Sequence, residues 1–276
     1  MRLQSHNAKP KPKFYGESNY HVGLELEVEA PDQDSKKAGL EICKRPQVFY
    51  AKSDGSLNAT GWELVTHPIA PQFWTAKKME GKNPVGRVLK LVKQLKDMDY
   101  TSYDNGRCGL HVHVSRTAFG KNGNRSLKNS RFYWFSRLVN GKLFAKLSQR
   151  EQSKIDQWAK QKEVKVKTLV PRSFDTRYVA VNVTKQTVEV RIFRGNMRED
   201  RVRKAVEAVI AAVEFAGTIS SKHWKRDLEE MFAGWVSRNG DRFPNLKRYL
   251  FDIGVLVRRE DNATAARTWV GELVEV

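Results

Sequence analysis

Strict alternation between apolar and polar residues constrains this chain more than any other feature. Residues 21–30 place a branched apolar residue at every second position, with histidine, glycine and glutamates between them. The same alternation appears in residues 108–116 and 187–193. Because successive side chains of a β-strand point to opposite faces, each segment predicts a strand with one buried face and one polar face.

Each of these predicted strands carries two chemically active side chains, two positions apart, on its polar face. The pairs are Glu25 and Glu27, His111 and His113, and Glu189 and Arg191. One charged pair on the wet face of an antiparallel sheet is common, and a solvated face explains it equally well. Three pairs on separate strands instead indicate that the polar faces converge on one concave surface.

Converging carboxylates repel one another unless a cation lies between them. Carboxylate and imidazole ligands favour Mg²⁺ or Mn²⁺ over metals that prefer thiolates. Cys43 and Cys108 are too far apart in sequence to form a zinc finger. A cupin-type barrel also contains His-x-His, but that pattern includes a glutamate a few residues later, and residues 115–120 contain none. The sequence therefore predicts a site for hard divalent cations.

Turn residues and hydrophobic spacing predict the remaining elements. Further strands are expected over residues 48–52, 61–66 and 178–183. Helices are expected over residues 84–98, 126–148 and 199–219, with shorter ones near residue 153 and in the C-terminal quarter. These elements predict an α+β fold with a curved, mainly antiparallel sheet and helices packed on one side. We expect residues 1–18 to be a flexible basic arm and residues 19–276 to be a single catalytic domain.

Composition limits the partners. The 276 residues include 50 lysines and arginines against 31 aspartates and glutamates, and the net charge of +19 favours an anionic partner without specifying which anion. With only two cysteines, a disulfide scaffold is excluded and a reducing, cytoplasmic location is expected. We find neither a signal-peptide core nor an apolar stretch of membrane-spanning length, so we expect no membrane partner.

Phosphate binding in this chain must rely on arginines. Neither the P-loop pattern nor the Gly-x-Gly-x-x-Gly pattern occurs in the sequence. Arg191 shares the predicted polar face with Glu189, and Arg172, Arg177 and Arg194 lie near it in sequence. Guanidinium groups offer two parallel donors that suit phosphate oxygens. For Arg172 and Arg194, however, a structural ion pair is the better explanation.

An ordered set of short motifs resembles the amidoligase family, which is similar to glutamine synthetase and glutamate-cysteine ligase. The motifs are Gly23-Leu-Glu25-Leu-Glu27, Asp54-Gly55-Ser56, Gly61-Trp-Glu63-Leu-Val65, Cys108-Gly109-Leu110-His111-Val-His113, and Arg177 through Asn182 to Val188-Glu189-Val-Arg191-Ile-Phe193. The resemblance covers about residues 20–216. It implies a catalytic domain like that of glutamine synthetase and an ATP-dependent joining of a carboxylate to an amine through an acyl-phosphate.

The resemblance also implies roles for individual residues. Glu25, His111 and Glu189 correspond to ligands of one metal that bridges the ATP phosphates, and Glu27 and Glu63 to ligands of a second metal near the acyl transfer. His113 and Arg191 correspond to contacts of the transferring phosphoryl group, with Arg177 and Arg194 as further ATP contacts. Asp54 and Ser56 correspond to amine contacts, although a simple turn explains them equally well, and Asn182 corresponds to a contact of the carboxylate substrate. The implied cofactors are ATP and Mg²⁺ or Mn²⁺.

A different class of function stays open. The net charge, together with alternating lysines at 160, 162, 165 and 167, is also typical of a nucleic-acid-binding or metal-dependent nucleic-acid-processing protein. The aromatic residues Phe132 to Phe135 fall in a helix-like segment and are expected in the core. The sequence specifies neither the carboxylate, which could be a small molecule or a peptide, nor the amine.

Overall fold

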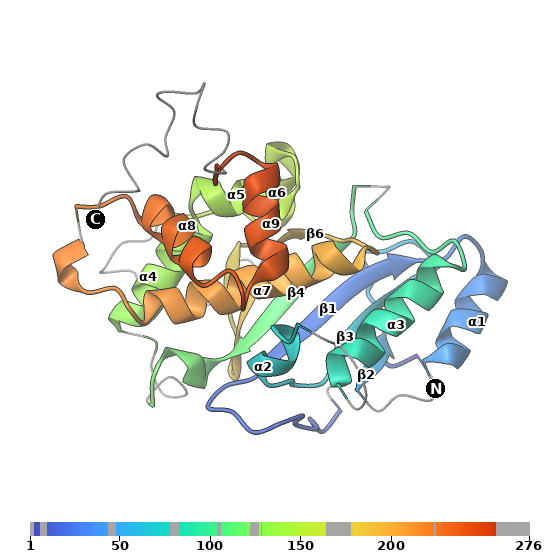
Figure 1. Cartoon of the computed structure of the whole chain (residues 1–276). Coiled ribbons are helices and arrows are strands. Elements are labelled where there is room, and N and C mark those ends of the chain that lie inside the picture. The colour runs from blue at the N-terminus through green and yellow to red at the C-terminus, as the bar shows by residue number, and fades with distance from the viewer. Residues whose placement is uncertain are drawn as a thin grey trace.

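The fold was analysed in a computed structural model that describes residues 3–5, 10–43, 48–77, 83–103, 106–121, 127, 129–163, 178–223 and 225–257. Figure 1 shows a twisted sheet with helices lying across it. The strands are β1 (Val22–Glu29), β2 (Phe49–Lys52), β3 (Gly61–Thr66), β4 (Gly109–Ser115), β5 (Val181–Val183) and β6 (Thr187–Arg194). The helices are α1 (Gln33–Ile42), α2 (Pro71–Trp74), α3 (Pro84–Lys96), η1 (Arg116–Phe119), α4 (Ser130–Val139), α5 (Lys142–Ser148), α6 (Gln152–Trp158), α7 (Glu199–Ala216), η3 (Ser221–His223), α8 (Leu228–Arg238) and α9 (Pro244–Asp252).

All six described strands form one sheet in the order β2-β3-β1-β4-β6-β5. Every neighbouring pair in this order is antiparallel. The expected α+β class with an antiparallel sheet is therefore confirmed. The order puts β1, β4 and β6, which carry the three polar pairs, side by side in the middle of the sheet.

One face of the sheet is covered by helices. The branched residues of β1, from Val22 to Val28, are 0 % exposed at every second position, and the matching positions of β4 and β6 are equally buried. Helix α7 packs against β4 and contacts α2, α3, α4, α8 and α9. In Figure 1, α2, α3 and α7 lie across this same face. Burial of the apolar face fixes the strand register, so the opposite face must collect the polar side chains.

The predicted helix over residues 126–148 is wrong, because two helices replace it. Asn140 ends α4, and its Nδ2 donates to the carbonyl oxygen of Ser136 at 2.8 Å. Helix α5 begins after Gly141, where Glu229 Oε1 accepts a hydrogen bond from the backbone N–H of Leu143 at 3.0 Å. Glu229 comes from α8, far away in sequence, so local spacing could not reveal this break.

Parts of residues 1–18, which we expected to form a flexible arm, lie against the sheet. The backbone N–H of Gln4 donates to the carbonyl of Ala51 at 3.1 Å, and that of Tyr15 donates to the carbonyl of Pro68 at 2.9 Å. Of the alternating lysines, Lys165 and Lys167 fall outside the described residues. Within the described part of the chain, no helix has the length and apolar character needed to cross a membrane. Cys43 and Cys108 are both buried and are not joined in a disulfide.

Candidate functional site

Strand register places the polar pairs directly opposite one another. Glu25 pairs with His111 across β1 and β4, and His113 pairs with Glu189 across β4 and β6. On the other side of β1, Glu27 lies opposite Glu63 of β3. Directly opposed residues in an antiparallel pair have neighbouring side chains on the same face. The three polar pairs do converge on one face, as the alternation predicts.

These side chains line a cavity of about 340 Å³. Apart from Arg177, which falls outside the described residues, every sequence-predicted site residue lines it except Arg194. The Arg194 guanidinium instead lies 4.4 Å from the ring centre of Tyr103. Arg172 also falls outside the described residues. Glu29 shares the strand face but does not line the cavity, and one of its oxygens accepts from the backbone N–H of Asn58 at 3.4 Å.

A first group of ligand atoms comes from Glu25, His113 and Glu189, and these atoms all lie within 4.8 Å of one another. His113 Nε2 is 3.4 Å from Glu25 Oε1 and 4.0 Å from Glu189 Oε1. The resemblance implied His111 in this group, and His111 Nδ1 is indeed 3.5 Å from both carboxylates. Both of these imidazole nitrogens are buried and have no hydrogen-bond donor or acceptor aligned with them among the described residues.

Charge interactions dominate this group. Burial alone would raise the pKa of Glu25, but His113 and His111 beside it hold that pKa well below its usual value. Burial likewise opposes ionisation of Glu189, and His113 and Arg191 nevertheless lower its pKa. Burial disfavours the charged form of His113, yet Glu25 and Glu189 raise its pKa. Without a metal, the imidazolium of His113 therefore acts as the counter-ion of two buried carboxylates.

Glu189 is oriented by two further side chains. Arg191 Nη1 donates to Glu189 Oε1. Asn182 Nδ2, from the neighbouring strand β5, donates to Glu189 Oε2 at 2.8 Å. Asn182, which the resemblance implied as a substrate contact, thus positions a carboxylate of the first group.

A second group contains Glu27, Asp54 and Glu63, again with ligand atoms within 4.8 Å of one another. Asp54 Oδ1 accepts from both the backbone N–H and the hydroxyl of Ser56 at 2.6 Å, so the predicted turn exists and fixes this carboxylate. Glu27 Oε2 accepts from the backbone N–H of Gly109 at 2.5 Å. Asp54, which the resemblance implied as an amine contact, therefore lies beside two possible metal ligands, Glu27 and Glu63.

Lys52 links the two groups, although the sequence analysis did not identify it. Its Nζ lies 2.8 Å from Glu63 Oε2 and 3.9 Å from Glu25 Oε1. Burial and the charge of Glu25 nevertheless raise the pKa of Glu63 to about 9. One ammonium is thus insufficient to stabilise all the carboxylates of this cavity in their ionised form.

The cavity also has basic and aromatic lining residues, which are Arg107, Arg150, Trp158, Tyr178 and Arg191. The rings of Trp158 and Tyr178 meet edge to face, with centres 5.7 Å apart. Of these five residues, only Arg191 was identified from sequence, because Arg107, Arg150, Trp158 and Tyr178 lie outside the alternating strands and share no spacing with them.

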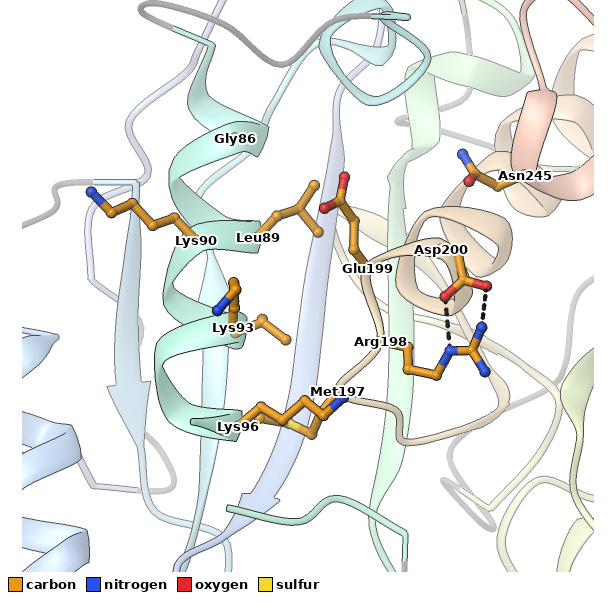
Figure 2. Close-up of a pocket in the computed structure, with 11 residues that line it drawn as sticks. Gly86, Leu89, Lys90, Lys93, Lys96, Met197, Arg198, Glu199, Asp200 and Asn245 are labelled. Atoms are coloured by element: carbon orange, nitrogen blue, oxygen red, sulfur yellow. Dashed lines mark hydrogen bonds and ion pairs between the residues drawn. The ribbon is translucent and has the colours of Figure 1, made fainter. Parts of the chain in front are cut away.

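A wider cavity, of about 630 Å³, lies between α3 and the start of α7 (Figure 2). Two of its basic residues have local partners: Lys93 pairs with Asp97 at 2.6 Å, and Arg198 with Asp200 at 3.0 Å. Exposed pairs of this kind contribute little free energy. The smaller cavity is the better candidate site because its charges are buried and converge from several strands.

Comparison with models of known protein families finds no match, and comparison with curated proteins finds none either. The case for a function therefore rests on the residues and geometry of the cavity.

Proposed function

We propose that the protein is an ATP-dependent carboxylate-amine ligase that uses divalent cations. The observation that carries this proposal is the presence, in one cavity, of two groups of hard-cation ligands together with arginine and aromatic side chains. Ligases of this class must hold a polyanionic nucleotide beside metal ions and must also bind an amine. The carboxylates and the arginines of the cavity suit these two requirements.

The ligand set fits Mg²⁺ or Mn²⁺. The donors are carboxylate oxygens and imidazole nitrogens, and neither free cysteine lines the cavity. His111 Nδ1 and His113 Nε2 lie 3.5 Å and 3.4 Å from Glu25 oxygens but have no aligned hydrogen-bond partner among the described residues, which supports a bound cation between them. Glu25, Glu189 and a histidine would hold one cation, and Glu27, Glu63 and Asp54 a second. When bound, the cations would neutralise phosphate charge.

In the proposed reaction, a substrate carboxylate oxygen attacks the γ-phosphorus of ATP, and ADP leaves. The amine then attacks the acyl carbon, phosphate leaves, and the amine loses a proton to form the amide. Arg191 and His113 would align the phosphoryl group, since positioning and charge stabilisation supply most catalysis in phosphoryl transfer. Asp54 and Ser56 would contact the substrate amine, as the resemblance implies.

The test is incubation of the protein with ATP, Mg²⁺ and pooled amino acids, amines and short peptides. The expected result is ADP, phosphate and a condensed product whose mass equals that of both substrates less one water. Glu25→Gln should remove this activity, and Glu17→Gln, which alters an exposed carboxylate outside the cavity, should retain it. Equal activity in Glu25→Gln and the wild type would refute the proposal.

A metal-dependent nucleic-acid-processing enzyme is the second candidate. It is favoured by the net charge of +19 and by exposed Lys90, Lys93 and Lys96 along one helix. Such an enzyme could use the same cation groups to cleave a phosphodiester. Incubation with DNA and RNA in Mn²⁺, without ATP, distinguishes the candidates, because only this one yields shortened strands.

A further inference from the structure

Arg150 is a buried arginine without a close ion pair among the described residues, and its guanidinium lies 5.8 Å from the ring centre of Tyr103. It is 8 % exposed and lines the cavity. Its Nε and Nη1 atoms are buried and have no hydrogen-bond partner among the described residues. A buried guanidinium with unpaired donors is unfavourable, so natural proteins rarely keep one without a reason.

The sheet leaves room for this side chain at Gly109. Positions 109, 111 and 113 of β4 point to the cavity face, and only position 109 lacks a side chain. A Cβ atom at Gly109 would lie 2.5 Å from Arg150 Nη2 and 2.9 Å from His111 Nε2. The missing side chain thus lets the guanidinium reach the strand beside His111.

The turn that precedes Arg150 positions its side chain beside Gly109. Helix α5 ends at Gln149, which adopts a positive φ of 60° and turns the chain. The buried ammonium of Lys204, on α7, donates to the carbonyl of Leu147 at 2.6 Å and to Gln149 Oε1 at 3.1 Å. This places a buried cation on the last turn of α5, where the carbonyl groups need donors. Arg150 is therefore held by a supported turn rather than by its own ion pair.

The surroundings of Arg150 suit an anion. Burial is the largest cause that lowers its pKa; Glu27 opposes this shift, and Arg191 adds to it. Arg191, which lines the same cavity, also has a buried Nε without a partner among the described residues. Arg191 pairs with Glu189 through Nη1, so its Nε and the Nε and Nη1 of Arg150 are the donors left without partners among the described residues. A bound anion would supply acceptors for them.

We infer that Arg150 binds a phosphoryl group and that, with Arg191, it forms the phosphate subsite of the cavity. The inference rests on the proposed nucleotide-dependent function and identifies an additional binding residue outside the strand motifs. Planar guanidinium groups bind phosphate oxygens through parallel hydrogen bonds. The nucleotide would then lie beside Trp158 and Tyr178, and the amine would lie beside Asp54.

Binding of three probes tests this inference: ADP with Mg²⁺, inorganic phosphate and uncharged adenosine, each measured by calorimetry. Arg150→Met should weaken binding of ADP and phosphate by roughly ten- to a hundredfold, because charged hydrogen bonds are lost. Adenosine binding should not change. Lys146→Gln is the matched control, because it removes one exposed positive charge from α5 and should leave all three affinities unchanged.

A stability measurement separates a binding role from a structural one. Without ligand, Arg150→Met should melt at the same temperature as the wild type or higher, because it removes an uncompensated buried charge. If the variant does not fold, Arg150→Lys replaces it: weaker phosphate binding supports the inference, since an ammonium lacks the paired donors.

Equal ADP and phosphate affinities in the substituted and wild-type proteins would overturn the inference while leaving the ligase proposal standing. Failure of the wild type to bind either probe would also overturn it. Conversely, phosphate binding that depends on Arg150 in a protein without ligase activity would support the subsite and reject the proposed reaction.

Discussion

Two regions of this protein bury charged side chains, and they treat those charges in opposite ways. Inside α7, Glu207 is 0 % exposed and accepts hydrogen bonds from the backbone N–H groups of Asn245 and Leu246 and from the Asn245 side chain. Lys204, 2 % exposed, donates to the end of α5. Each of these charged side chains of α7 thus forms hydrogen bonds with backbone groups at the end of another helix, where those groups lack partners within their own helix. On the sheet, the charges face one another, and among the described residues His111 Nδ1, His113 Nε2 and Arg191 Nε have no aligned hydrogen-bond partner.

The difference separates structural charge from candidate binding charge. Burial alone does not distinguish the two regions, and perturbed pKa values do not either, since burial raises the pKa of Glu207 to about 7. What differs is whether the protein itself supplies the partners. If this distinction is correct, substitutions in the cavity should reduce activity at little cost in stability, and substitutions in α7 should do the reverse.

The largest expected effect is that of Glu189→Gln. Loss of a charged ligand of the proposed cation removes several kcal/mol of transition-state stabilisation, so ligation should fall by roughly a thousandfold. Stability of the metal-free protein should change little, because the shape and the hydrogen bond from Asn182 can persist. Assays of ADP release and thermal melting measure both quantities. A large drop in melting temperature with activity retained would contradict the distinction between binding charge in the cavity and structural charge in α7.

Arg191→Lys should have the second largest effect. Turnover should fall by roughly a hundredfold, which is the range found when one hydrogen-bond donor to the transition state is lost. Lysine keeps the charge near Glu189 but cannot provide two parallel donors. Steady-state kinetics and denaturant titration should show a loss of kcat with modest loss of stability. If stability falls while kcat survives, Arg191 is a structural ion-pair partner.

Glu207→Gln tests the opposite region and should lower the free energy of unfolding by about 1–3 kcal/mol, because an amide nitrogen would face backbone donors at the start of α9. Urea titration at pH 8 measures this loss. Nucleotide affinity and ligation should remain at wild-type levels. A selective loss of ligation would show that α7 takes part in the site.

Lys204 should give stability a particular pH dependence. Burial lowers its pKa to about 7 in the folded protein, below the 10.5 of a free lysine. Between these values the unfolded chain binds one more proton, so stability should rise with pH by at most about 1.4 kcal/mol per unit. The difference in urea stability between wild type and Lys204→Met, measured from pH 7 to 10, isolates this contribution. A flat difference would contradict the assignment.

Substitution of a single exposed charged residue should have the smallest effect. If the basic surface binds nucleic acid, affinity should fall steeply with salt, and Lys90→Gln should reduce the log–log slope by about one unit. Lys90 is exposed on α3, outside the candidate cavity. Fluorescence anisotropy with DNA, RNA and an acidic polypeptide measures the slope. Absence of binding to all three at low salt would indicate that the surplus charge only maintains solubility.

The alternating segments allowed much of the sheet and its polar face to be predicted. Alternation fixes which face each side chain occupies, so the pairs on the three strands could be assigned to polar faces before the strands were known to be neighbours. The grouping of Glu25, His111 and Glu189 came from the resemblance. The sequence could not predict the break after Asn140, because the capping Glu229 lies in a distant helix. It also could not predict Lys52 or Arg150, whose positions depend on strand pairing and on a turn supported by Lys204.

Gly109 and Arg150 are far apart in sequence, yet the structure makes them occupy one volume. A side chain at position 109 would displace the Arg150 guanidinium and press on the His111 ring, so Gly109→Ala should be harmful alone and milder when combined with Arg150→Ser. Selection acting on such a pair preserves or replaces both members together. Among related sequences, covariation of these two positions would therefore identify the proteins that share this anion-binding arrangement.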